Sequence, residues 1–374
     1  MSVIQSHTRN KIFKVLAFGV SFLLFGSAFA SGGSEEHSKK SFNAGEMIMH
    51  HIADQHQVHI ASFGENHISI PLPILLVDDG LKFFSASKFY HNPVQIPGLT
   101  SHAYQYENYV MVDEHIFKVG TDGALSVENG EVSSTTLKPF DLSITKSVFG
   151  FIITGFLLLL LFVTAARKYK RNKNQAPSGV QTLIESLVLF VRDDIVVPSI
   201  GEKKADKFLP FLLTTFFFIW LANMLGLIPF VGGFNIMGTI GVTVILALCV
   251  FVITTINANK GYWMHIFWPP NVPFAIKLIL VPIEVFQIFL KPIILMIRLT
   301  ANITAGHIII LAFVSLIFIF GESSVAGGYG VGAGSLIFMI FMNFIELLVA
   351  FLQAYVFTLL AALYFGSAVE EAHH

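Results

Sequence analysis

Long apolar runs separated by short polar segments fill the chain from about residue 148 onward. A helix needs about 20 apolar residues to cross a bilayer whose hydrocarbon core is about 30 Å thick. Five runs meet that length, and we expect spans at residues 148–166, 208–228, 236–256, 276–320 and 335–367. The pattern therefore predicts an all-α polytopic membrane protein.

The last two runs are longer than one crossing requires. A continuous helix over residues 281–320 would be about 60 Å long at 1.5 Å per residue, twice the apolar thickness of a membrane. We therefore expect this helix to be strongly tilted, or bent at Pro292. The glycine-rich stretch 321–334 is expected to be a loop between the two long helices, and it lacks the Gly-Lys-Ser/Thr of a nucleotide site.

Two segments outside the spans have recognisable patterns. Residues 179–196 carry four charged side chains among apolar ones, and Pro198 follows, so we expect an interfacial helix on the cytoplasmic side that ends at Val196. Residues 1–30 combine basic residues, a short apolar core and an Ala-Phe-Ala site, which is typical of a secretory signal peptide cleaved after Ala30. The alternative is a first anchor that is retained.

Residues 31–143 differ in composition from the rest of the chain. Short apolar runs broken by turn residues predict a small β-rich extension. It would be periplasmic if residues 1–30 direct export. A membrane domain is expected to follow over residues 144–374. The extension contains a group of histidines, namely His50, His51, His56, His59 and His67. Histidines at such spacing could bind zinc, but the spacing matches no zinc finger, so we favour a solvated histidine-rich surface and predict no metal site.

Composition and charge narrow the function classes. The chain is 54% hydrophobic with a mean hydropathy of +0.70 and a net charge of −1, which places it in lipid and argues against nucleic acid as a partner. Five basic residues directly follow Ala166, so that end of the first span is expected to be cytoplasmic, as is the C-terminus. The single cysteine, Cys249, lies in an apolar run and is expected to pack in the core.

Arg298 lies in the middle of the fourth apolar run, where a charge is costly. Insertion scales price a central arginine at about 2.5 to 3.5 kcal/mol, and no acidic residue lies within one helical turn of it. Glu284, Lys291 and Arg298 recur every seven positions and so fall on nearly one face of the predicted helix, with Asn302 one turn further on. The missing negative charge must come from elsewhere in the fold or from another subunit.

Three further polar residues accompany this arginine. His307 lies roughly opposite Arg298 on the same helix, while Glu346 and Gln353 share a face of the last helix. Ionisable residues inside a membrane bundle mark ion paths and proton relays. His307 and Glu346 can exchange protons near neutral pH, whereas arginine keeps its charge and can act as a fixed positive gate.

The polar residues stand in motifs that resemble a known family. The pattern Arg-Leu-x-x-Asn-x-x-Ala-Gly runs from Arg298 to Gly306, and Glu-Leu-Leu-x-x-x-Leu-Gln-Ala-Tyr-Val-Phe runs from Glu346 to Phe357. Together with residues 221–229, they resemble the a subunit of the F-type ATP synthase over roughly residues 140–374. Some bacterial members have a glutamate after the Ala-Gly and a histidine in the last helix. This chain has the reverse arrangement, like mitochondrial members.

The resemblance implies a proton channel in the stator of a rotary motor of the bacterial inner membrane. It implies that Arg298 faces the essential carboxylate of a rotating c-ring, that Gln353 lies near Arg298, and that Glu346 and His307 serve an access half-channel. Protons would leave past Glu284. The implied partners are the c-ring, the b subunits of the peripheral stalk, protons and the lipid bilayer, and the chain would contain no catalytic residue and no cofactor.

Other classes of function fit the sequence less well. A stand-alone ion-coupled transporter would also bury an arginine and carboxylates, but its halves are normally related by an internal repeat, and five spans do not divide that way. A membrane-embedded hydrolase needs a nucleophile with a base, or a metal site, and no such set is evident. The choice between proton and sodium, the ring size, the dominant direction and the role of the extension stay open.

Overall fold

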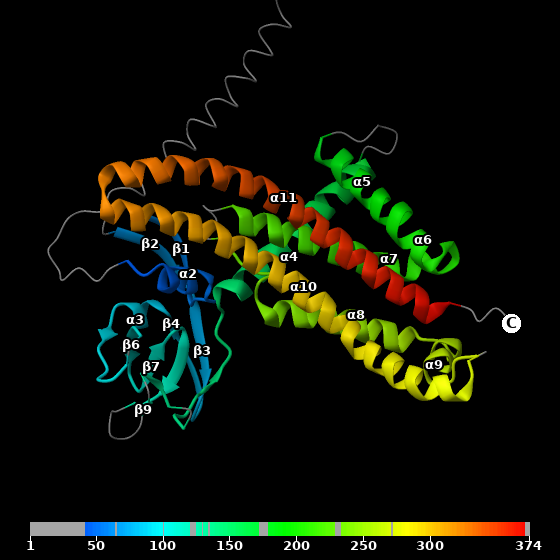
Figure 1. Ribbon diagram of the computed structural model, residues 1–374, viewed down its shortest axis with the longest axis horizontal. Coiled ribbons are helices and arrows are strands. Elements are labelled where there is room, and N and C mark those ends of the chain that lie inside the picture. The colour runs from blue at the N-terminus through cyan, green and yellow to red at the C-terminus, as the bar shows by residue number, and fades with distance from the viewer. Residues whose placement is uncertain are drawn as a thin grey trace, which may run out of the picture.

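The structure is a computed structural model that describes residues 42–370 apart from 64–65, 100, 120–124, 129, 134, 172–178, 229–232 and 271. The predicted signal peptide lies outside the described residues. Figure 1 shows a helical bundle dominated by two long curved helices that lie side by side, with a β-rich unit beneath one end of this pair.

Five of the described helices are long and apolar enough to cross a membrane, in agreement with the predicted number of about five. They are α4 (Lys146–Arg171), α7 (Glu202–Leu227), α8 (Ile240–Asn257), α10 (Phe274–Ser323) and α11 (Val325–Val369). Helix α10 has 50 residues, which corresponds to about 75 Å. It continues through both Pro282 and Pro292, because neighbouring helices can compensate for the backbone bonds that proline removes in a membrane.

The predicted glycine-rich loop at 321–334 is wrong. Helix α10 ends at Ser323 and α11 begins at Val325, so nearly all of this stretch is helical. A Cβ atom at Gly328 would come within 2.9 Å of the Gly321 Cα, so the absence of side chains lets the two helices meet closely. Small residues favour such close approach between membrane helices, and helical backbone bonds are obligatory where water is absent.

The segment after α4 is helical as predicted but extends beyond its predicted end. Helix α5 (Val180–Phe190) passes into a π-helical turn, η2 (Val191–Val196), and then into α6 (Val197–Ile200). Pro198 therefore lies at the start of a helical turn rather than after the end of the helix. A proline needs no N–H donor at that position, so the helix continues to Ile200. Another short helix, α9 (Lys260–Phe267), precedes α10.

Helix α7 is the centre of the bundle. More than half of its most apolar stretch is buried, and it packs against α4, α11 and η2. Its Phe208 and Phe216 reach Phe365 and Phe351 of α11, with ring centroids 5.0 and 5.8 Å apart respectively. In contrast, α10 buries few of its side chains and leaves most of one apolar face exposed. The core thus lies on one flank of the α10–α11 pair.

The β-rich unit confirms the predicted character of the extension. Its strands are β1 (Gln57–Phe63), β2 (Asn66–Pro71), β3 (Pro73–Val77), β4 (Leu81–Ser85), β5 (Pro93–Val94), β6 (Ala103–Tyr106), β7 (Tyr109–Val112), β8 (His115–Lys118), β9 (Val127–Glu128), β10 (Glu131–Val132) and β11 (Phe140–Asp141). They form antiparallel sheets in the orders β1-β2, β9-β10, β11-β3-β4 and β5-β6-β7-β8. Helix α3 (Ser87–Tyr90) packs Phe89 into the core between the two larger sheets.

The extension is attached to the bundle at two places. Helix α2 (Ala44–Ile52) packs against α10, where the Phe42 ring lies 5.2 Å from Phe318 and the Phe42 N–H donates to Glu322 Oε1 at 3.3 Å. At the second place, the Lys146 N–H at the start of α4 donates to the carbonyl of Gln55 at 2.8 Å.

Two predictions about side-chain exposure are wrong. His56 is not part of a solvated surface but is 2% exposed, with Nδ1 3.1 Å from Glu114 Oε2 and Nε2 3.8 Å from Asp141 Oδ2. Burial of a charged group requires such partners, and these two carboxylates supply them. Cys249 is exposed on α8, because α8 presents much of its apolar surface outward. The structure does not describe the side chains of His50, His51 and His67.

Candidate functional site

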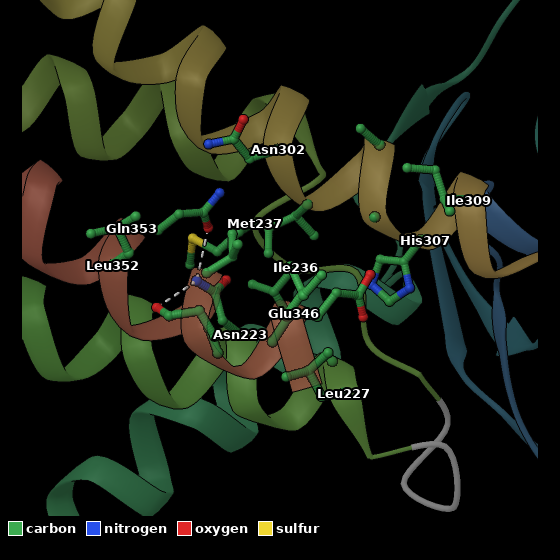
Figure 2. Close-up of a pocket in the computed structure, with 18 of the residues that line it drawn as sticks. Asn223, Leu227, Ile236, Met237, Asn302, His307, Ile309, Glu346, Leu352 and Gln353 are labelled. Carbon is green, nitrogen blue, oxygen red and sulfur yellow. Dashed lines mark hydrogen bonds between the residues drawn. The ribbon is translucent and has the colours of Figure 1, made fainter. Parts of the chain in front are cut away.

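A cavity of about 400 Å³ lies between α7, α10, α11 and the connection that contains Phe234 and Ile236. Five of the six residues predicted from the sequence line it, namely Arg298, Asn302, His307, Glu346 and Gln353. Figure 2 shows two groups: Asn302 and Gln353 at one end, near Asn223, and His307 with Glu346 at the other. Residues from three helices that are far apart in the sequence thus meet in one site.

Arg298 projects from the outward face of α10. Its side chain is exposed in the single chain, and its neighbours Ile294 and Ile297 are 46% and 52% exposed. The five ion pairs found among the described residues all lie elsewhere, so none of the described carboxylates is within 4 Å of the guanidinium. The arginine therefore stands on an apolar surface with space beside it for an acid from another molecule.

Gln353 is held by a residue that the sequence-based site did not include. Asn223 of α7 donates from Nδ2 to Gln353 Oε1 at 3.0 Å and to the Ala350 carbonyl at 3.4 Å, and both polar side chains are buried. This bond fixes the Gln353 amide with its NH₂ group toward the cavity. Asn223 is a polar residue inside an otherwise apolar span, which is the signal by which it could have been found.

Gly306 permits the close approach of Glu346 to α10. A Cβ atom at position 306 would overlap the Glu346 carboxylate, so the absence of a side chain gives that carboxylate its place beside the helix. His307 follows directly, and its Nε2 would lie 3.8 Å from a Cβ atom at Gly226 of α7. The absence of a side chain at Gly306 thus lets the Glu346 carboxylate of α11 lie beside the turn of α10 that bears His307.

Several polar atoms in and around the cavity have no hydrogen-bond partner among the described residues. They are Asn223 Oδ1, Asn235 Oδ1, Glu346 Oε2 and Gln353 Nε2. Burial of an unpaired polar atom costs about 1 to 3 kcal/mol, whereas a cavity of this size can admit water that satisfies such atoms. The arrangement is therefore suited to hydrated polar groups that exchange protons.

Glu284 is not brought into this cavity. It lies fourteen residues before Arg298 on α10, which places it about 21 Å away along the helix axis, and it interacts electrostatically with Tyr262 of α9. Lys291, the middle member of the seven-residue series, lies 5.4 Å from the ring centroid of Tyr364 and lines a separate cavity of about 20 Å³. Glu284, Lys291 and Arg298 thus lie on one helix, as predicted, but they do not meet in one cavity.

No group of three or more His, Cys, Asp or Glu side chains that could hold a metal ion is present in the part of the chain that the structure describes. Thr300, a further polar residue of α10, has a packing role, since the Thr300 and Thr243 hydroxyls are 2.7 Å apart and join α10 to α8. Hydroxyl pairs of this kind are common between membrane helices.

Comparison with known proteins assigns most of the chain to one family. Residues 148–366 match the family model described as ATP synthase A chain, and residues 47–142 match a domain of unknown function. The chain is 42% identical over 264 residues to ATP synthase subunit a 2 of Chlorobaculum tepidum, which covers 69% of this chain and 71% of the relative. It is 38% identical over 270 residues to ATP synthase subunit a of Chloroherpeton thalassium, with coverage of 71% and 76%. The chain therefore belongs to the family of the a subunit of the bacterial F-type ATP synthase.

Proposed function

We propose that this chain is the stator subunit of the membrane sector of ATP synthase, in which it carries protons to and from a rotating ring of small subunits. Family membership supports a role in the membrane sector. The exposed arginine and the polar cavity support the specific roles proposed below. The chain itself carries out no nucleotide chemistry in this proposal.

The observation that carries the proposal is the position of Arg298. A permanent cation on an exposed apolar helix face is unfavourable unless a negative charge arrives from outside. A ring that presents one carboxylate after another would supply it, and the guanidinium would favour the ionised form of each carboxylate as it passes. A proton could then not cross directly past Arg298, so transport would require rotation.

The cavity fits the proposed access route. Protons would enter near His307 and Glu346 at one end of the cavity, and Gln353 and Asn302 would lie beside the arginine at the other. Exit would follow a separate route past Glu284, which fits its distance of about 21 Å from Arg298 along α10. Each proton that crosses 100 mV supplies about 2.3 kcal/mol for rotation.

We propose the following placement in the cell. Residues 1–30 would be removed as a signal peptide, 31–143 would form a periplasmic extension, and 144–374 would cross the inner membrane. The basic residues that follow Ala166 support a cytoplasmic location for the end of α4, by the excess of Lys and Arg on that side. The C-terminus would also be cytoplasmic.

The proposal is tested by the change Arg298→Ala in membranes that contain the whole complex. We expect loss of ATP synthesis driven by a proton gradient, with the soluble head still able to hydrolyse ATP. The matched control is Arg192→Ala, since Arg192 is an exposed arginine in η2 that contacts only Asp193 among the described acids. Normal coupled synthesis in Arg298→Ala vesicles would refute the proposed role.

The partners are tested separately. We expect the purified chain to travel with a ring of small two-helix proteins and with the b subunits of a peripheral stalk. Purification of the chain alone, with substrate transport after reconstitution, would favour the alternative of a stand-alone ion-coupled transporter.

A further inference from the structure

The sheet β11-β3-β4 of the extension has an apolar outer face. Residues that pair directly across antiparallel strands place their side chains on the same face of the sheet. The register of this sheet therefore gathers six apolar side chains in two rows, which we call the apolar sheet face. The rows are Phe140, Val77 and Leu81, and then Leu142, Leu75 and Phe83.

The largest side chains of the apolar sheet face are mostly exposed. Phe83, Leu81 and Phe140 are 73%, 69% and 66% exposed. Since a phenylalanine contributes about 150 Å² or more, the two phenylalanines alone present on the order of 200 Å², and the aliphatic side chains enlarge this area. Contiguous apolar patches beyond a few hundred Å² are rare on surfaces that face water, and they mark contact with a protein or a membrane.

Strand β3 is apolar on both of its faces. Its inner residues Ile74 and Leu76 are fully buried and pack in the core with Phe89 of α3. An antiparallel strand with one face in water normally alternates apolar and polar residues, whereas a strand that is covered on both faces is apolar throughout. Residues Pro73–Val77 follow the second pattern. The sequence of β3 therefore indicates that its outer face is also covered in the working protein.

The apolar sheet face is joined to the first membrane helix. Phe140 precedes Lys146, the first residue of α4, by six positions, and six extended residues reach about 20 Å. The Ile144 N–H donates to the Pro73 carbonyl at 3.1 Å, so the bonding of the sheet continues almost to the start of α4. Just inside α4, Val148 is already exposed. The apolar sheet face thus leads into the outward apolar surface of a membrane span.

The orientation of the sheet turns this face toward the membrane. In Figure 1, α3, β6 and β7 lie on the side of β3 that is away from the bundle. The inner face of the sheet packs against α3, β7 and β8, so the apolar sheet face is turned toward the ends of α4 and α8 that lie next to the extension. Figure 1 also shows β3 running across the direction of α8 rather than along it. Because membrane helices run roughly along the membrane normal, the sheet lies along the membrane surface beside the bundle.

We propose that the apolar sheet face rests on the lipid bilayer and anchors the extension to the membrane surface next to the start of α4. Apolar surfaces of this kind enter the boundary between headgroups and acyl chains by about 5–10 Å. The outward positions of the three described strands carry no charged side chain, so this contact would bury no charge. The inference requires only that α4 crosses the membrane and does not depend on proton transport by Arg298.

The test places a photoreactive side chain on the apolar sheet face. Phe83→benzoylphenylalanine and Phe140→benzoylphenylalanine are made in the full chain, and native membranes that contain the assembled complex are irradiated before any detergent is added. Mass spectrometry of the labelled peptides then identifies what each position touches. The same replacement at Phe156, a 64% exposed residue of α4, is the lipid reference. The replacement at His102, an exposed residue of the extension outside the apolar sheet face, is the matched control.

We expect lipid adducts at positions 83 and 140 in yields similar to that at position 156, and a loss of these adducts at position 102. Cross-links from positions 83 and 140 to another protein, whether a ring subunit or a second copy of this chain, would overturn the inference in favour of a protein interface. The absence of any adduct there, with lipid adducts at position 156, would also overturn it.

Two further points keep the test decisive. If the replacements at Phe83 and Phe140 prevent assembly, the same replacement at Leu81 decides by the same criteria, since Leu81 lies on the same face outside the core. The cross-links report contact and not transport, so the result of Arg298→Ala leaves this inference unchanged. Lipid adducts combined with normal coupling in Arg298→Ala would therefore refute the proposed function alone.

Discussion

The buried charge cluster around His56 predicts that the extension loses stability in alkaline solution. Burial alone would lower the pKa of His56, but its contacts with Asp141 and Glu114 outweigh burial and raise the pKa from 6.5 to about 9. The native extension therefore holds the imidazolium form more tightly than the unfolded chain does. A group with a raised pKa stabilises the fold fully below its unfolded value and loses this effect as the pH rises through the folded value.

The magnitude follows from the size of the shift. At 1.36 kcal/mol per unit, the rise to about 9 corresponds to roughly 3 kcal/mol below pH 6.5, of which about 2 kcal/mol remains at pH 7.5 and almost none above pH 10. The pKa of the partner Glu114 determines how the cluster responds to acid. Burial alone would raise this pKa, but hydrogen bonds from the His56 ring and backbone lower it. Acid below the usual range of a carboxyl group therefore also weakens the cluster, and the two effects describe one interaction.

Hydrogen exchange of the extension in the full chain measures this effect. Protection factors for strands β6 to β8, corrected for the intrinsic exchange rate at each pH, should fall by about two orders of magnitude between pH 6.5 and pH 10. In His56→Gln this fall should disappear, with lower protection already at pH 6.5. His102→Gln, at an exposed position, should behave like the parent. An unchanged pH slope in His56→Gln would refute the reasoning.

Two glycine substitutions test the packing of the site and the bundle. Gly306→Ala should displace the Glu346 carboxylate and reduce proton-driven ATP synthesis several-fold, measured in vesicles with equal amounts of assembled complex; an undiminished rate would contradict the proposed role of that acid. Gly366→Ala would place a Cβ atom against the Ser199 carbonyl and should destabilise the packing of α11 on α6 by about 1–3 kcal/mol, seen as a lower melting temperature of the purified protein. Gly155→Ala, where nothing lies within 4 Å of an added Cβ, is the control for both and should change neither quantity; an equal effect there would show that local contact is not the cause.

The number of spans could be predicted because length and hydropathy alone select helices that can cross a membrane. The ends could not all be predicted. Glycine weakens helices in water-exposed chains, so the sequence predicts a loop from Gly321 to Gly334. In lipid an unpaired backbone costs more than the entropy of glycine, and close helix contact favours small residues. The same stretch is therefore helical in the structure.

The candidate site was predicted in part because a charge in lipid is conspicuous. Arg298 identified the region, and the residues around it in the cavity followed from their helix positions. The seven-residue spacing that joined Glu284 to this set defines a helix face but not a depth, so Glu284 lies far along α10. The partnership of Asn223 with Gln353 spans 130 positions and depends on helix packing that no local pattern encodes.

The burial of Lys146, which is 7% exposed, is not evident from the sequence, because a lysine at the end of an apolar run usually extends its ammonium to water. The sequence shows only that Lys146 is a cation at the end of the first span that the positive-inside rule does not explain. Only the fold shows that the extension covers it. Tertiary burial, which the sequence does not reveal, separates an ordinary flanking lysine from a cation held inside the protein.

Arg298 lies at the midpoint of α10, whose bounds are Phe274 and Ser323. The helix is braced near both ends: Lys277 lies 4.3 Å from the Trp268 ring centroid at one end, and Phe42 meets Phe318 at the other. Near its centre, the Thr300 hydroxyl contacts that of Thr243 on α8 at 2.7 Å, and α11 lies alongside the helix. A sideways load on the guanidinium would thus be shared along the helix, and the arginine would keep its position while a neighbouring surface moves past.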